Sequence, residues 1–232
     1  MQGKKILAIV PARAGSKRLP NKNSMLLKDK PLIQWTIEAA LASKLIDRVL
    51  VSTDCTELAS LSEQLGAWVP FLRPETLATD TSTTVDVVKH CLSFVAEQGL
   101  KYDYLMLLQP TSPLRDTDDI DNAITTLYER KGDAIVSVCQ CEHPPQWTMA
   151  LDDTLKMDDF VSKMVKNNKR SQDLPSYYRL NGAIYLVDIQ RFLQESSLFL
   201  SSNSFAFEMS QLHSIDIDTL IDFKLAEVLI NK

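Results

Sequence analysis

The feature that most constrains the fold is a regular alternation of short apolar runs with longer segments of helical periodicity. Residues 5–11 read KILAIVP, a continuous apolar run that is typical of a strand buried on both faces. Residues 31–44 follow with apolar side chains at helical spacing and with proline in the first turn. The chain is therefore expected to begin with a strand, a polar loop and a helix.

The same alternation continues through most of the chain. We expect helices near 56–65, 83–98, 118–129, 189–195 and 219–230, and strands near 48–53, 68–72, 104–108, 134–138, 183–187 and 205–209. Strands joined by helices predict crossover connections and a mainly parallel sheet with helices on both faces. The predicted class is a doubly wound, Rossmann-like α/β fold, in which ligands bind beyond the carboxyl ends of the strands.

The length of 232 residues suits a single domain, 1–232. The alternation is interrupted at about 142–179, where prolines and clusters of Asp and Lys replace the apolar pattern. We expect an excursion from the core there, serving as a dimerisation segment.

Composition excludes several functional classes. A net charge of -5 and a pI of about 5.3 argue against nucleic acid as the partner. No run approaches the roughly 18 apolar residues of a membrane span, and the first strand leaves no room for a signal peptide, so we expect a cytoplasmic protein and no membrane partner. The cysteines fit neither a C-x-x-C pair nor a zinc quartet, and we expect reduced thiols that pack in the core. The histidines are assigned no role.

A basic loop directly follows the first strand. Residues 12–23 read ARAGSKRLPNKN and carry four cationic side chains, Arg13, Lys17, Arg18 and Lys22. Gly15 and Ser16 lie between the first two of these. Cationic groups and closely approaching backbone N–H groups bind phosphate oxygens, and the position at a strand's carboxyl end favours this interpretation over a merely solvated loop. The loop matches neither the Walker sequence nor the G-x-G-x-x-G fingerprint.

Two aspartates alternate with isoleucines in SIDID, residues 214–218. If this segment is a strand, Asp216 and Asp218 lie on one face about 6.6 Å apart along the chain and could share Mg²⁺. The alternative is that Asp218 caps the helix beginning at Thr219. A third polar segment, LLQPTSPLR at 107–115, leaves the strand at 104–108 and places Gln109, among other polar groups, at the same edge of the sheet.

The combination of these segments resembles a known family. PARAGSKRLPNKN, RPETLATDTST at 73–83, LQPTSPLR, RLNGAIY at 179–185 and SIDID occur in the order found in the acylneuraminate cytidylyltransferases, or CMP-sialic acid synthetases. The resemblance spans nearly the whole chain. It implies a nucleotidyltransferase fold, a homodimer, and activation of a sialic-acid-like nonulosonic acid with CTP, which gives CMP-sugar and pyrophosphate.

The resemblance also implies roles for particular positions. It assigns catalysis to Arg13, Lys17, Asp216 and Asp218, with Lys17 neutralising the reacting phosphate and the two aspartates holding Mg²⁺, or Mn²⁺ as an alternative ion. The nucleotide-binding residues it implies are Arg13, Ser16, Lys17, Lys22, Asn23, Arg73 and Ser82. The sugar-binding residues it implies are Gln109, Arg170, Asn181, Tyr185 and Phe199, with Arg170 reaching across the dimer.

The sequence departs from the family pattern in ways that leave the sugar open. Kdo cytidylyltransferases carry an Asp where Gln109 stands, which weighs against Kdo. Trp147 occupies the place of a lysine found in some sialic acid synthetases, and Leu198 replaces one of an aromatic pair. Legionaminic acid and other diamino nonulosonates are therefore alternative substrates. A nucleotide-binding module without turnover is an alternative from a different functional class.

Overall fold

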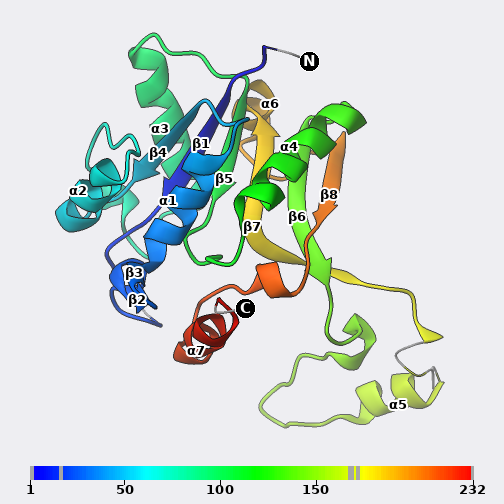
Figure 1. The fold of residues 1–232 in the computed structure, drawn as a ribbon. Helices are drawn as coiled ribbons and strands as arrows, with labels where there is room; N and C mark the ends of the chain where they lie inside the picture. Colours follow the sequence, from blue (N-terminus) through cyan, green and yellow to red (C-terminus); the bar gives the residue numbers. More distant parts are fainter. Residues whose placement is uncertain (1–2, 16–17, 167–169, 171–172, 231–232) are drawn as a thin grey trace.

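The structure is a computed structural model that describes residues 3–15, 18–166, 170 and 173–230. Its described residues form a six-stranded sheet in the order β4-β1-β5-β7-β6-β8 (Figure 1). The strands of this sheet are β1 (Ile6–Pro11), β4 (Arg48–Ser52), β5 (Tyr104–Leu108), β6 (Ala134–Gln140), β7 (Tyr178–Asp188) and β8 (Ser204–Glu208). Two short strands, β2 (Leu26–Leu27) and β3 (Lys30–Pro31), pair separately.

The sheet is mainly parallel, as predicted. β1 pairs in parallel with β4 and with β5, and β6 pairs in parallel with β8, whereas β7 runs antiparallel between β5 and β6. The helices are α1 (Leu32–Ala42), α2 (Thr56–Gln64), α3 (Thr84–Glu97), α4 (Thr117–Arg130), α5 (Asp158–Lys166), α6 (Ile189–Glu195) and α7 (Leu220–Leu229). None of these helices is both long and apolar enough to cross a membrane.

Both faces of the sheet are covered because β1 is apolar at every position. Ile6, Ala8 and Val10 point into a core cluster that includes the inner faces of α1 and α4. Leu7 and Ile9 point to the opposite face, into a cluster with α3 and α6. Alternate side chains of a strand point to opposite faces, so a continuous apolar run requires a helical layer on each side.

The helix starts follow from local capping chemistry. The Thr83 side chain accepts a hydrogen bond from the backbone N–H of Asp86 and begins α3. Asp116 and Asp119 form a reciprocal capping box that begins α4. Such side chains satisfy backbone N–H groups that have no partner within the helix.

One expected strand, 68–72, is wrong, and the strand considered as one possibility for 214–218 is not formed. The segment 68–72 makes only isolated bridges, Leu50 with Trp68 and Thr53 with Leu72, beside the edge strand β4. Residues 214–218 are not a strand either: a short 3-10 helix, η5 (Leu212–Ser214), leads into unpaired extended chain. Thr219, not Asp218, caps α7, because its side chain accepts from the N–H of Asp222.

The segment that interrupts the α/β alternation lies between β6 and β7, and a role for it in dimerisation stays a prediction. Between β6 and β7 the chain passes through a 3-10 turn, η3 (Pro145–Trp147), and through α5. Figure 1 shows α5 set well away from the helical layers. Exposed apolar side chains mark this segment, among them Leu155 at 68% and Val165 at 72% exposure.

Candidate active site

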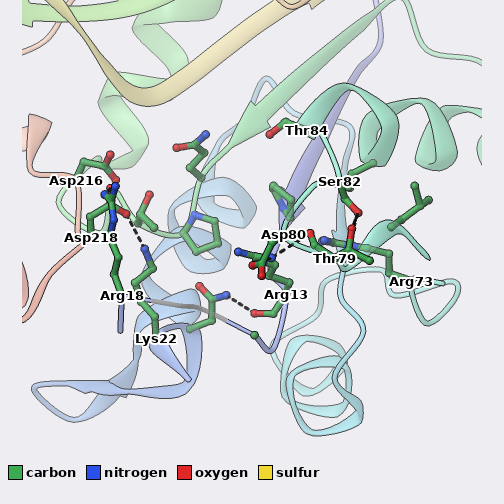
Figure 2. Close-up of a pocket in the computed structure, with 18 residues that line it drawn as sticks. Arg13, Arg18, Lys22, Arg73, Thr79, Asp80, Ser82, Thr84, Asp216 and Asp218 are labelled. Carbon is green, nitrogen blue, oxygen red and sulfur yellow. Dashed lines mark hydrogen bonds and ion pairs between the residues drawn. The ribbon is translucent and has the colours of Figure 1, made fainter. Parts of the chain in front are cut away.

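A pocket of about 560 Å³ opens at the carboxyl edge of β1 and β5, where the sheet predicts a ligand site (Figure 2). Its walls come from the loop after β1, the loop after β5, the segment before α3, and the segment before α7. Its lining residues include Arg13, Gly15, Arg18, Lys22, Asn23, Arg73, Asp80, Ser82, Gln109, Thr111, Asp216 and Asp218. Most of the sequence-predicted site residues thus meet in one place. Ser16 and Lys17 lie outside the described residues.

The loop after β1 is held open by its own polar contacts. The Asn23 side-chain amide donates to the Arg13 carbonyl at 3.0 Å. The Ala14 N–H donates to Asp54 Oδ1 at 2.8 Å, which fixes the loop to the end of β4. A Cβ added at Gly15 would meet no described atom within 4 Å outside its chain neighbours. Gly15 therefore leaves open space on the pocket side, as close approach of a ligand requires.

Asp218 is neutralised by cations from the same loop. Its carboxylate accepts from Lys22 Nζ and from Arg18 Nη1, each at 3.1 Å. Lys22 also donates to the Ile217 carbonyl at 2.6 Å, and its side chain is only 11% exposed. Lys22 therefore ties the basic loop to the segment that carries the two aspartates.

Asp216 is the less neutralised of the two aspartates. Its Oδ1 atom is buried and has no hydrogen-bond partner among the described residues. Burial raises the pKa of this carboxyl, the neighbouring Asp218 raises it further, and a hydrogen bond from Thr111 and the charge of Lys22 act in the opposite direction. An unpartnered buried carboxylate oxygen fits a hard divalent cation, which prefers oxygen ligands.

The alternation of SIDID holds although the segment is not a strand. Ile217 is fully buried in a cluster with Phe223, while Asp216 and Asp218 both line the pocket. The backbone N–H of Ile217 donates to the Thr111 carbonyl at 2.8 Å. Extended chain with period two therefore puts both carboxylates on one face, held by the loop after β5 instead of by a sheet partner.

Gln109 lines the pocket floor beside Gly182. Gly182 has φ +74, and a Cβ at this position would lie 3.0 Å from Gln109 Oε1 and 3.8 Å from Asp216 Oδ2. Only glycine adopts this conformation readily and leaves room for both side chains. The side chains of Gln109 and Asp216, predicted to bind sugar and metal, thus both lie beside the backbone of Gly182 in β7.

Arg73 reaches the pocket from a buried position. It is 6% exposed, and its guanidinium donates to Ser52 Oγ at 3.0 Å and to the Ser52 carbonyl at the end of β4. Burial lowers its pKa, although the charged form prevails for any arginine near neutral pH. Arg73 is therefore a fixed cation in the wall of the pocket.

Ser82 organises the loop between Arg73 and α3. Its hydroxyl donates to the Thr76 carbonyl at 3.0 Å, accepts from the Thr79 N–H at 3.1 Å and lies 2.7 Å from the Thr79 hydroxyl. Asp80 in the same loop accepts from Arg13 Nη1 at 3.0 Å (Figure 2). Sequence reasoning missed Asp80, although it lies within the RPETLATDTST segment.

Four of the five predicted sugar-binding residues, Asn181, Tyr185, Phe199 and Arg170, do not line this pocket. Asn181 is 2% exposed, and its amide is occupied by Ser137 Oγ at 2.6 Å and Ser214 Oγ at 2.9 Å. Tyr185 is half-buried and packs edge-on against Phe199, with ring centroids 5.7 Å apart. Burial raises the pKa of Tyr185, and the charge of Asp216 raises it further. Asn181 thus hydrogen-bonds the segment before Asp216 through Ser214. The Phe199 ring is 52% exposed.

Arg170 lies in the excursion beyond β6 and pairs with Asp173, Nε to Oδ2 at 2.9 Å. Its side chain is 74% exposed and does not line the pocket. Trp147 in the same excursion stacks on His143, with ring centroids 6.3 Å apart. A role for Arg170 across a dimer stays a prediction.

A contact between His213 and Asp119, which do not line this pocket, was not expected from the sequence. His213 Nδ1 lies 2.7 Å from Asp119 Oδ2, which joins η5 to the first turn of α4. The three groups Asp116, Asp119 and His213 converge within 4.8 Å, but both carboxylates already serve the capping box. His213 thus anchors the segment that leads to Asp216.

Comparison with known proteins identifies the family. The sequence pattern of the cytidylyltransferase family matches residues 7–231. The chain belongs to the cytidylyltransferases. It is therefore a nucleotidyltransferase, and the acylneuraminate cytidylyltransferase resemblance is confirmed.

Three relatives of this cytidylyltransferase indicate the range of the family. It is 39% identical to the CMP-N,N'-diacetyllegionaminic acid synthase of Legionella pneumophila over 97% of this chain and 96% of the relative. It is 41% identical to the N-acylneuraminate cytidylyltransferase of Escherichia coli over 96% of this chain, but it spans only 51% of that relative. It is 32% identical to the pseudaminic acid cytidylyltransferase of Campylobacter jejuni over 97% of this chain and 96% of the relative.

Solved structures support the fold. A CMP:2-keto-3-deoxy-manno-octonic acid synthetase complexed with CTP superposes with a TM-score of 0.73 at 17% identity, over 98% of this chain and 99% of the other. The 4-diphosphocytidyl-2C-methyl-D-erythritol synthase of Anaerococcus prevotii gives a TM-score of 0.64 at 15% identity, over the whole of both chains. The predicted nucleotidyltransferase fold is confirmed.

Proposed function

We propose that this cytidylyltransferase activates a sialic-acid-like nonulosonic acid with CTP. The anomeric hydroxyl oxygen of the sugar would form a bond to the α-phosphorus of CTP and release its proton to solvent water. The bond between that phosphorus and the oxygen bridging to the β-phosphorus would break, leaving CMP-sugar and pyrophosphate. Relatives named for legionaminate, neuraminate and pseudaminate support this substrate class.

One observation carries the proposal: a single pocket combines four described cationic side chains with a buried carboxylate oxygen that has no hydrogen-bond partner in the described part of the chain. Arg13, Arg18, Lys22 and Arg73 supply the positive charge for a triphosphate, with Lys17 as a further candidate. Positioning and electrostatic stabilisation account for most of the catalysis in phosphoryl transfer. The fixed positions of Arg73 and Lys22 suit such preorganised stabilisation.

Asp216 and Asp218 are the residues that would hold Mg²⁺, or Mn²⁺ in its place. When bound, the ion supplies Lewis-acid polarisation and charge neutralisation for the phosphate chain. Gln109 at the pocket floor would contact the sugar beside them. The nearby phenol of Tyr185 and the edge-packed Phe199 would extend this sugar-binding region beyond the described pocket.

The test measures pyrophosphate released from CTP by the purified protein, with and without MgCl₂, across a panel of N-acetylneuraminic, N,N'-diacetyllegionaminic, pseudaminic and Kdo acids. Release that needs both the metal and a nonulosonic acid supports the proposal. Strong activity with UTP or dTTP and an aldose phosphate contradicts it. CTP binding without turnover across the panel favours a binding module without catalysis.

Matched variants test the metal residues. Asp216→Asn and Asp218→Asn should each abolish turnover, whereas Asp118→Asn, at an exposed position in the first turn of α4, should leave it unchanged. Circular dichroism and thermal melting establish that each variant folds. Unchanged turnover in folded Asp216→Asn rejects the metal assignment.

A diamino nonulosonate of the legionaminic type is the second candidate substrate. Its support is the match to the legionaminate synthase over nearly the full length of both chains, together with the departures at Trp147 and Leu198. Ranking kcat/KM across the same panel separates the two candidates. A homodimer and a cytoplasmic location are further parts of the proposal; light scattering and cell fractionation test them.

A further inference from the structure

Arg115 is a fully buried arginine beneath the pocket floor. It is 1% exposed and lies directly before α4, at the end of the LQPTSPLR segment. Its Nη1 atom donates to the carbonyls of Ala183 at 3.0 Å and of Gln109 at 3.3 Å. Its Nη2 atom donates to Thr36 Oγ1 at 2.8 Å. One guanidinium thus joins the loop after β5, β7 and α1.

The hydrogen-bond partners of this cation are neutral. Each described hydrogen-bond acceptor of Arg115 is a carbonyl or a hydroxyl, and its Nε atom has none. Burial lowers its pKa to about 10, although the charges of Asp119 and Asp116 act in the opposite direction, so the guanidinium still carries its charge at neutral pH. A buried charge that is hydrogen-bonded only to neutral groups is costly to stability.

The acceptors of Arg115 adjoin the site. Gln109, whose carbonyl it holds, presents its side chain to Gly182, and Ala183 is the next residue of β7. From Gln109 the loop continues to Thr111, whose carbonyl accepts from the N–H of Ile217. Thr111 also hydrogen-bonds Asp216. Arg115 therefore fixes both ends of the contact between the loop after β5 and β7.

We propose that Arg115 is a positioning residue for the proposed reaction, and that its guanidinium clamps the loop after β5 against β7 so that Gln109 and Asp216 converge at Gly182. The inference rests on the proposed function for its kinetic consequence, but the clamp itself is a structural statement. Arg115 does not reach the substrate in this scheme. It acts through the backbone that carries Gln109 and Thr111.

The kinetic test compares Arg115→Met and Arg115→Lys with the wild type. Loosening a reacting constellation by about 1 Å lowers the rate by about 100-fold, so kcat of Arg115→Met should fall to this extent. The CTP KM should change by less than about threefold, because the cations of the triphosphate site are untouched. Arg115→Lys keeps the charge but lacks the planar fork, and it should recover only part of kcat.

Arg191→Met is the control for loss of a structural arginine. Arg191 pairs with Asp133 and Glu195, each at 2.7 Å, away from the pocket. This variant should lose stability with kcat unchanged. A folded Arg115→Met with wild-type kcat, or one whose activity falls only in proportion to the fraction unfolded, overturns the inference.

Hydrogen exchange tests the clamp without reference to catalysis. In Arg115→Met, peptides covering 109–115 and 214–218 should exchange faster than in the wild type, while a peptide covering β1 should not. Equal exchange in Arg115→Met and the wild type refutes the clamp, even if the wild type turns over no sugar. A wild type without activity counts against the proposed function alone.

If neither substitution at position 115 folds, Thr36→Val provides the test. This near-isosteric change removes one acceptor of the guanidinium, a hydrogen bond worth about 1 kcal/mol, which corresponds to a roughly fivefold lower kcat. Wild-type kcat and wild-type exchange of residues 109–115 in that variant reject the inference.

Discussion

Replacing Gly182 by alanine tests how closely the two halves of the site must approach. Gly182 has φ +74, where a residue with a Cβ incurs about 1–2 kcal/mol of strain. The new methyl would lie 3.0 Å from Gln109 Oε1, and moving that side chain off its rotamer costs about 0.5–1.5 kcal/mol. The sum is about 1.5–3.5 kcal/mol. At about 2–4 °C per kcal/mol for a chain of this size, the Tm of Gly182→Ala should fall by roughly 3–14 °C.

Gly99→Ala is a matched control for this change. Gly99 has φ +70 at the end of α3, and a Cβ there meets nothing within 4 Å. Gly99→Ala should be destabilised only by the backbone strain of about 1–2 kcal/mol and should keep full activity. In Gly182→Ala, by contrast, displacement of Gln109 by a few tenths of an ångström should lower kcat/KM for the sugar by roughly tenfold, with the CTP KM unchanged. Equal sugar kinetics in the two variants would refute the assignment of Gln109 to the sugar.

Three further predictions use other groups of the site and core. Asp80 pairs with Arg13 and so competes with the phosphates of CTP for this cation. Asp80→Asn should therefore lower the CTP KM, by at most about fivefold, because exposed ion pairs are worth about 0–1 kcal/mol. A raised KM contradicts this competition. Burial raises the pKa of Asp216 in the folded state, so folding favours the protonated carboxyl. The free energy of unfolding therefore falls as the pH rises from the ordinary aspartate pKa through the raised pKa of the folded state. Asp216→Asn should therefore raise the Tm at pH 7 by a few degrees, relative to the wild type without metal, and the gain should vanish in melts at about pH 3, below the ordinary aspartate pKa. Iodoacetamide at pH 8 should label the partly exposed Cys141 well before the buried Cys91, whose pKa burial raises to about 11; mass spectrometry showing the reverse order contradicts the core packing.

The elements that sequence predicts well are those whose burial is two-sided or whose ends are capped. β1 and β5 follow from continuous apolar runs, and α3 and α4 follow from the α/β alternation; the structure shows Thr83 and Asp116 as the caps of these two helices. The segment 68–72 misled because its apolar residues resemble a strand. Pro70 lacks an N–H for a ladder, and the segment lies outside edge strand β4, where isolated bridges suffice.

The placement of Asn181 shows why the rest of the site was not predictable. Regular alternation along β7 would put Asn181 on the same face as Tyr185. The pairing with β6 is irregular at this point: Val136 faces Tyr185, whereas Val138 faces Leu180. This bulge contains Gly182 with its positive φ, and Asn181 turns into the interior. Bulge positions depend on tertiary pairing, which the period of a single strand does not encode.

The cations of the proposed triphosphate site are already partly neutralised in the free protein. Arg13 is paired with Asp80, while Arg18 and Lys22 share Asp218. A triphosphate must therefore displace carboxylates as well as water, which reduces its net gain from each cation. A divalent ion held by Asp216 and Asp218, as proposed, would relieve this competition, because it takes over the charge of Asp218 and frees two cations for phosphate. Metal and nucleotide binding should then be mutually reinforcing, since coupling between two ligands is reciprocal.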